Sequence, residues 1–317
     1  MVETALLLPP LLSAIILGSL YALMAMGLTL IYSTIRILNF AHGAFFMAGA
    51  YIVWWLNTPE SATRLFGTSI PVSGLQLPLL VAVIPAVIII FGAGVATQKA
   101  LILPLIRKPN TLITTLVATL ALATILESVA TLIFGGGRFS YAQELVVGNV
   151  RLELVVGNVR FGELIVTYVE IIQFAVAIGV LVALYLFLKK SRIGIGMRAV
   201  AQDLDAASLC GINTQTVYLL TFGIGAALAA LAGFLLTNII FLSPSVGATP
   251  LTIAFIVVVF GGIGSVPGTV IASYVVALVQ QYVTLLLDPS WGLSFAFILM
   301  IAVLIIRPRG LFGFKET

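Results

Sequence analysis

The most constraining feature of this sequence is a stretch of 44 residues, Ser13 to Leu56, whose only full charge is Arg36. A single helix of that length would measure about 66 Å, roughly twice the hydrocarbon thickness of a bilayer. The segment must therefore fold back or break. We expect the break between Tyr32 and Gly43, where polar side chains interrupt the apolar character.

The rest of the chain is similarly apolar. Of its 317 residues, 61% are hydrophobic and 8% are charged, whereas soluble domains carry about 25% charged residues. So few charges cannot cover a water-soluble surface. The sequence therefore predicts an all-α, polytopic transmembrane helical bundle with about eight or nine spans, in a single domain over 1–317. Beyond the first stretch, the expected spans are 79–97, 112–134, 167–188, 216–240, 251–260, 269–287 and 291–306.

The basic residues predict the orientation of the chain. With nine crossings and the N-terminus outside, eleven basic residues fall in the cytoplasm and four outside, and every Lys is cytoplasmic. Cytoplasmic loops of membrane proteins carry such an excess. We expect the N-terminus outside and the C-terminus in the cytoplasm. The net charge of +4 then comes from basic residues in cytoplasmic loops, and we expect no nucleic-acid partner.

Several chemistries are excluded by residue type. One Cys and one His cannot build a disulfide framework or a metal site that needs several such ligands, so no metal is expected. No Lys follows a Gly, so the phosphate-binding loop of an ATPase is absent. An intramembrane serine hydrolase is disfavoured because the only base for Ser265 would be His42, more than two hundred residues away. We expect a chain that is not an enzyme and binds no cofactor.

The expected outer loop, 135–164, contains a tandem repeat. Glu-Leu-Val-Val-Gly-Asn-Val-Arg occurs at Glu144–Arg151 and again at Glu153–Arg160. Gly-Asn between β-forming residues is typical of a tight hairpin turn, which predicts a three-stranded meander. The alternative is a duplication without a role in a tolerant loop.

The expected cytoplasmic loop, 189–213, has helical periodicity. Apolar or small residues recur from Met197 to Ser208, and polar ones fall on the other side, which predicts one amphipathic helix about three turns long. Such a helix can cap the bundle, rest in the membrane interface or dock into a groove on a partner.

Two glycine-interrupted segments, 39–43 and 261–268, are candidates for a solute path. Broken helices free backbone groups that can bind polar ligand atoms, although glycines also permit close packing and turns. The candidate path residues are Asn39, His42, Gly43, Gly261, Gly262, Gly264 and Ser265. His42 also fits the role of a hydrogen-bonded residue at a helix end.

Glu127 lies deep in an expected span, where a carboxylate costs about 3 kcal/mol unless it faces the bundle interior or a wet cavity. It fits a path-lining role and a helix–helix hydrogen bond equally well. Two further alternatives for the whole chain are an ion-coupled secondary transporter that uses Glu127 as its proton site and a passive channel for urea or amides.

The sequence resembles the permease subunits of ABC importers of the branched-chain amino-acid type, in particular LivH-like subunits. The matching segments are spread over nearly the whole chain. They are Gly27–Tyr32, Arg36–Gly43, Gly49–Tyr51, Arg198–Ala199, Asp203–Leu204, Ala207–Leu209, Gly211–Asn213, Gly261–Gly268 and Arg307–Gly313.

The resemblance implies a permease of the bacterial or archaeal inner (plasma) membrane that works by alternating access. Its implied partners are a homologous LivM-like permease subunit, two cytoplasmic ATPase subunits that bind ATP and Mg, an external solute-binding protein and the lipid bilayer. The cytoplasmic loop becomes the coupling helix that meets an ATPase. Its implied coupling residues are Met197, Arg198, Ala201, Asp203, Leu204, Asp205 and Gly211.

Two positions depart from this pattern. Many amino-acid transporters of this type have Glu where Ala44 stands and Lys where Ile253 aligns. Branched-chain amino acids are therefore the default solutes, and urea, short amides, other amino acids and aromatic acids stay open.

Overall fold

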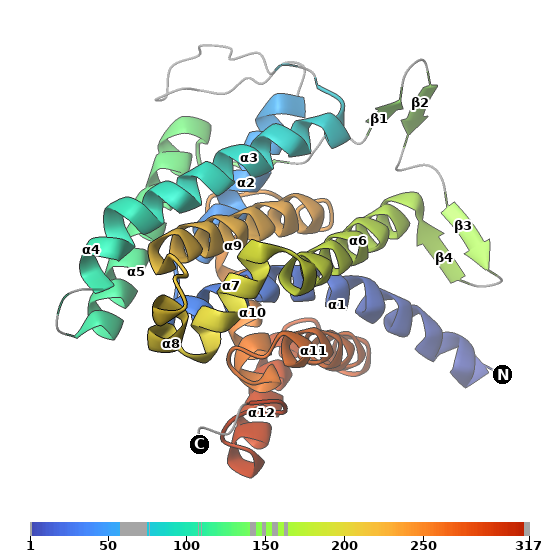
Figure 1. The fold of residues 1–317 in the computed structure, drawn as a ribbon. Coiled ribbons are helices and arrows are strands. Elements are labelled where there is room, and N and C mark those ends of the chain that lie inside the picture. Colours follow the sequence, from blue (N-terminus) through green and yellow to red (C-terminus); the bar gives the residue numbers. More distant parts are fainter. Residues whose placement is uncertain are drawn as a thin grey trace.

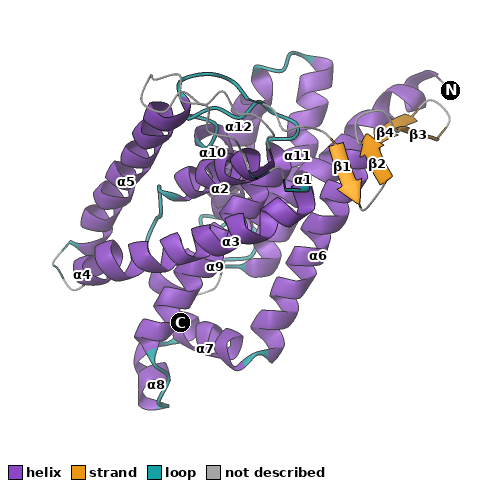
Figure 2. Ribbon diagram, turned by 90° about the horizontal axis from the view of Figure 1, so that it is seen from above, coloured by secondary structure: helices purple, strands orange, loops and turns teal. Residues whose placement is uncertain are grey.

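The computed structural model describes residues 2–57, 75, 77–106, 108, 110–139, 144–147, 150–153, 158–161 and 164–313. Its elements are mostly helices (Figures 1 and 2). In chain order they are α1 (Val2–Ile35), α2 (His42–Asn57), α3 (Leu79–Thr97), a π-helical turn (Gln98–Ile102), α4 (Leu103–Ile106), α5 (Thr111–Phe134), β1 (Glu144–Val147), β2 (Val150–Glu153), β3 (Asn158–Phe161), β4 (Leu164–Thr167), α6 (Tyr168–Lys190), α7 (Arg192–Gln202), α8 (Leu204–Leu209), α9 (Thr214–Leu236), α10 (Ala248–Gly261), α11 (Val266–Leu286) and α12 (Trp291–Ile306).

Helices α1 and α9 form the centre of the bundle. In their most apolar windows 89% and 78% of the residues are buried, against 17–28% in the spans built on α3, α5, α6 and α11. Figure 1 shows α3, α4 and α5 on one side of this centre and α11 and α12 on the other. The outer helices expose many Leu, Ile and Val side chains. Such faces are stable against lipid rather than water.

Within the described part of the chain, six helices are long and apolar enough to cross a membrane. They are Leu7–Ile35 of α1, α3 with its continuation to Ile106, α5, α6, α9 and α11. The prediction of an all-α membrane bundle is thus confirmed. The expected eight or nine spans are not confirmed, because α2, α10 and α12 have only 14 to 16 residues, and a full span needs about 20.

The expected break between Tyr32 and Gly43 is confirmed, since α1 ends at Ile35 and α2 begins at His42. Arg36 has a left-handed backbone with φ of 58°. Its N–H donates to the Tyr32 carbonyl at 2.9 Å, which closes the last turn of α1.

Glycines let the central helices approach closely. A Cβ on Gly27 of α1 would lie 2.7 Å from the carbonyl oxygen of Gly225 in α9. At the starts of α2 and α10, a Cβ on Gly43 would lie 2.7 Å from the carbonyl oxygen of Gly247. Backbones this close leave no room for a side chain, so these positions require glycine.

The packing of the first helices recurs in the last ones. α1 packs on α11 as α9 packs on α3, and α1 packs on α10 as α9 packs on α2. Likewise α2 contacts α3 and α5, and α10 contacts α11 and α12. The C-terminal end of α1 lies near α7, and so does the N-terminal end of α9. The corresponding helices α1 and α9 therefore run in opposite directions, and so do the two units α1–α5 and α9–α12. This is the arrangement of an inverted structural repeat.

The segment before α6 differs from the prediction. The expected three-stranded meander is wrong, because the strands form two separate antiparallel pairs, β1 with β2 and β3 with β4. In the first repeat copy, Val147 of β1 pairs with Val150 of β2. In the second copy Asn158 lies inside β3 and pairs with Thr167. Positions 140–143, 148–149, 154–157 and 162–163 of the expected loop lie outside the described residues.

Candidate functional site

The expected coupling residues lie on α7 and α8 or, for Asp203 and Gly211, directly beside α8, at the end of the bundle opposite the two hairpins (Figure 2). The prediction of one continuous amphipathic helix is wrong, because the helix breaks at Asp203. The Asp203 carboxylate accepts hydrogen bonds from the backbone N–H groups of Asp205 and Ala206, at 2.9 and 3.0 Å. Asp203 therefore starts α8 as its N-cap.

Helix α7 is anchored in the bundle. Met197 and Val200 are buried, and α7 contacts α1, α6 and α9. Its junction with α6 is tight, because a Cβ on Gly194 would clash with the backbone of Phe187 and Leu188. Helix α7 therefore packs directly on both central helices.

Helix α8, in contrast, is exposed. Leu209 is 89% exposed and Leu204 is 44% exposed, although the periodicity placed Leu204 on the same apolar side as the buried Met197. The turn after α8 contains the exposed Cys210, and Gly211 with a φ of 80°. α8 thus presents two leucines, one of them between Asp203 and Asp205, at one end of the molecule.

A cavity of about 970 Å³ lies beside α7 and joins residues of the two predicted sites. Among the coupling candidates, Met197, Arg198 and Ala201 line it, and among the path candidates only Gly264 does. We call this cavity the vestibule. It is bounded by the ends of α1, α6 and α7, the turn between α10 and α11, the end of α12 and the C-terminal segment up to Gly313.

Gly261, Gly262 and Ser265 lie at the junction of α10 and α11, next to the residues that line the vestibule. Gly261 and Gly262 pack against Gly268 and the C-terminal segment, and Ser265 Oγ accepts from the N–H of Gly268 at 3.2 Å as the N-cap of α11. Gly262 and Gly264 have φ values of 102° and 85°, which side chains rarely adopt. The packing and turn role foreseen as an alternative therefore explains these glycines.

Asn39, His42 and Gly43 lie in the core, away from the vestibule. Asn39 and His42 are fully buried. The Asn39 side chain accepts from the N–H of Ala41 at 3.1 Å, and His42 Nε2 lies 3.0 Å from the Met24 carbonyl oxygen. Asn39 Nδ2 and His42 Nδ1 have no hydrogen-bond partner among the described residues. His42 thus holds the start of α2 against α1.

Glu127 is not brought together with the other candidates. It lies on α5, one turn beyond buried Ala123, and its side chain is only partly buried. Its carbonyl oxygen accepts from Thr131 Oγ1 at 2.8 Å. The structure thus places Glu127 on an outer helix of the bundle.

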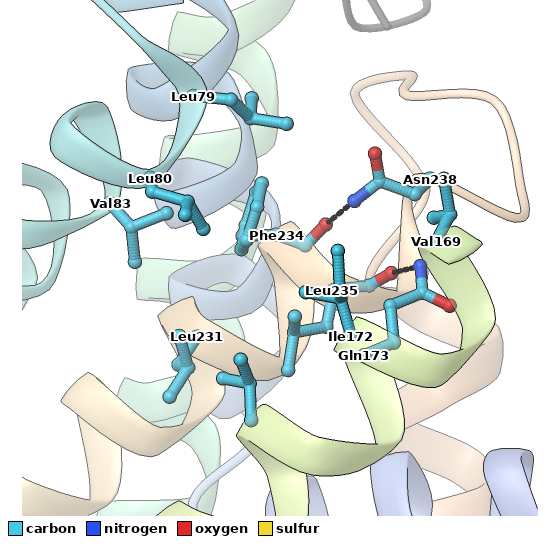
Figure 3. Close-up of a pocket in the computed structure, with 11 residues that line it drawn as sticks. Leu79, Leu80, Val83, Val169, Ile172, Gln173, Leu231, Phe234, Leu235 and Asn238 are labelled. Atoms are coloured by element: carbon cyan, nitrogen blue, oxygen red, sulfur yellow. Dashed lines mark hydrogen bonds between the residues drawn. The ribbon is translucent and has the colours of Figure 1, made fainter. Parts of the chain in front are cut away.

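A second, smaller cavity of about 80 Å³ lies between α3, α6 and α9 (Figure 3). Two amides mark its polar end, where Gln173 Nε2 donates to the Leu235 carbonyl and Asn238 Nδ2 to the Phe234 carbonyl, both at 2.8 Å. These carbonyls belong to the last turn of α9. Gln173 is 2% exposed.

Sequence reasoning did not single out these amides, nor the vestibule residues Arg36, Lys189 and Arg309. For these three cations the sequence offered one signal, the excess of basic residues expected on the cytoplasmic side.

Comparison with known proteins places the chain among transport permeases. The family model described as the permease component of the branched-chain amino acid transport system matches residues 11–304. The chain is 32% identical over 313 residues to the high-affinity branched-chain amino acid transport system permease protein BraD of Pseudomonas aeruginosa, an alignment that covers 97% of this chain and 96% of BraD.

Two LivH proteins are similar over comparable lengths. The high-affinity branched-chain amino acid transport system permease protein LivH of Salmonella typhimurium is 32% identical, covering 96% of this chain and 95% of that protein. A probable branched-chain amino acid transport permease LivH of Methanocaldococcus jannaschii is 30% identical, covering 95% and 90%. No solved structure matches the chain.

Proposed function

The chain belongs to the branched-chain amino acid permease family, and we propose that it is the membrane-spanning subunit of an ATP-driven importer. Its solutes are branched-chain amino acids or a related small polar solute, as the names of its relatives support. The chain has no phosphate-binding loop of its own, so two cytoplasmic ATPase subunits supply the energy. A homologous LivM-like permease and an external solute-binding protein complete the importer.

The exposure of α8 is the observation that carries this proposal. Exposure of the Leu204 and Leu209 side chains to water is unfavourable, by about 25 cal/mol for each Å² of apolar surface. A groove on an ATPase that takes both leucines removes that cost. Asp203 and Asp205 flank Leu204 at the start of α8 and can pair with basic residues at the rim of such a groove.

The proposed orientation puts α7 and α8 in the cytoplasm of a cell bounded by its plasma membrane. Basic residues gather at this end, with Lys189 and Lys190 in the last turn of α6 and Arg192 and Arg198 on α7. The first residues of α1 lie at the opposite end, where the Leu7 carbonyl accepts from Tyr282 Oη near the end of α11. The positive-inside rule then assigns α7 and α8 to the cytoplasm.

Alternating access follows from the packing of α7. ATP binding draws the ATPases together and moves α8 with them. Because α7 is anchored on α1, α6 and α9, the motion reaches the two central helices and shifts the bundle between outward-open and inward-open states.

Cys210 provides a direct test, because it is the only cysteine of the chain and lies at the exposed end of α8. The purified importer and the isolated permease are treated with a maleimide, and the labelling rate of Cys210 is measured. We expect docked ATPases to slow labelling strongly. Equal rates with and without bound ATPases would contradict docking at α8.

A matched pair of variants tests the leucines. Leu209→Ser removes apolar contact area from α8 and should weaken ATPase binding and ATP-driven uptake. Leu287→Ser, at a leucine that is 60% exposed beyond the far end of α11, is the control and should leave both unchanged. Uptake unaffected by Leu209→Ser would remove α8 from the coupling mechanism.

A further inference from the structure

Four cations from four different segments surround the vestibule. Arg36 follows α1, Lys189 belongs to α6, Arg198 to α7 and Arg309 to the C-terminal segment. None of the described residues that line this cavity is acidic. The four positive charges therefore face one space without a lining carboxylate to neutralise them.

The backbone holds Arg36 at the vestibule. Its neighbours Ile35 and Ile37 are buried, 8% and 1% exposed, while Arg36 itself is exposed. The left-handed backbone at Arg36 turns the chain between these two apolar anchors. The guanidinium is thereby kept out of the core and on the side of the cavity.

Arg309 is positioned by the C-terminal segment. The N–H groups of Leu311 and Phe312 donate to the carbonyl oxygens of Phe260 and Gly261, at 2.9 and 3.0 Å. These acceptors lie in the last turn of α10, which leaves them without helical partners. The segment is thus tied across the end of α10, and Arg309 reaches the vestibule from there.

Lys189 and Arg198 complete the set from α6 and α7. Each follows a buried anchor, Leu188 and Met197, 6% and 2% exposed. Lys189 Nζ also lies 5.7 Å from the centre of the Tyr185 ring. Both side chains are exposed, yet their helices fix them at the cavity.

Like charges around one cavity give it a positive potential, because low-dielectric walls concentrate the field. An anion gains free energy there and a cation loses it. The lining also holds apolar side chains such as Leu30, Val259 and Leu304, beside uncharged polar ones such as Ser33, Thr34 and Gln202. The vestibule therefore suits the carboxylate end of a small solute with an apolar body. In an amino acid, whose net charge is zero, the ammonium must point away from the four cations for the carboxylate to gain free energy there.

We propose that the vestibule is an anion-attracting compartment that holds the carboxylate of the transported solute on the cytoplasmic side and disfavours cationic solutes. The proposal rests on the proposed function, because it assigns the vestibule to the path of an importer. It adds the charge preference of the path and the four residues that create it.

The electrostatic potential in the vestibule can be measured without a transport assay, from the rates at which charged reagents modify a thiol placed there. In a Cys210→Ser background, Gln202→Cys places a thiol on a residue that lines the vestibule, and Gln215→Cys places one on an exposed residue of α9 that does not. Each is modified with a negatively and a positively charged methanethiosulfonate. We expect the anion-to-cation rate ratio to be about sevenfold higher at position 202 for each kT of potential.

Charge variants identify the source of the potential. Arg36→Gln with Arg309→Gln should lower the ratio at position 202 several-fold, and so should raising the salt concentration. Lys190→Gln with Arg192→Gln is the matched control, because these exposed cations are neighbours of the vestibule that do not line it. Equal ratios at positions 202 and 215 would overturn the proposal.

The complete importer in proteoliposomes tests the role in transport. Arg36→Gln with Arg309→Gln should lower uptake of an apolar amino acid a few-fold, because its carboxylate then meets two cations instead of four, while ATPase activity and Cys210 protection persist. Unchanged uptake would overturn the carboxylate role and leave the importer assignment intact. Absence of ATP-driven uptake by the unmodified complex, with Cys210 unprotected, would instead overturn the proposed function together with this role.

Discussion

At the scale of single residues, His42 and Gly27 depend on each other. The imidazole reaches the Met24 carbonyl only because Gly27, less than one turn away on α1, has no side chain. A Cβ on Gly27 would lie 2.8 Å from His42 Cε1 and 2.7 Å from the Gly225 carbonyl oxygen. One glycine thus permits both the contact of α1 with α2 and its crossing with α9.

Gly27→Ala should destabilise the permease by about 1–3 kcal/mol, because overpacking forces backbone shifts. The matched control is Gly92→Ala on α3, where an added Cβ meets nothing within 4 Å. It should be neutral or slightly stabilising, since Ala favours a helix. Thermal unfolding in detergent measures both, and equal melting temperatures for the two variants would contradict the close packing.

At the scale of elements, the sequence predicted one helix break and missed another. The break after Ile35 was predictable, because Arg36 and Asn39 could not lie inside an unbroken apolar span. The break at Asp203 was missed because apolar residues keep a helical period on both sides of it. The available signal was the side chain itself, since Asp is among the preferred N-cap residues.

Asp203→Ala should weaken α8 by about 1 kcal/mol and reduce coupling to the ATPases, because two N–H groups lose their acceptor. Asp203→Asn keeps the acceptor, loses the charge and should restore most of the activity. ATPase stimulation by solute and binding protein is the measurement. Equal losses in both variants would show that the charge matters and the cap does not.

At the scale of the whole molecule, a single sequence could not locate the vestibule. Arg36, Lys189 and Arg309 lie far apart in the chain, and only the packing of the C-terminal segment on α10 brings Arg309 near Arg36. For the same reason the sequence did not show that α1–α5 and α9–α12 pack alike. The apolar composition, in contrast, sufficed to predict a helical membrane bundle.

The orientation of the whole chain has its own test. In intact cells, a membrane-impermeant maleimide should label Leu287→Cys in a Cys210→Ser background and should not label native Cys210. The reason is that position 287 follows the far end of α11, whose first residue Val266 lines the vestibule. The reverse labelling pattern would invert the proposed topology.

The central claim is that this chain is a passive gate driven by ATPases that bind α8. The most direct measurement is solute accumulation in proteoliposomes that contain either the complete importer or this chain alone. We predict ATP-dependent accumulation against a gradient by the complete importer, lost with Leu209→Ser, and none by the chain alone. Accumulation by the chain alone, with no other polypeptide present, would contradict the account.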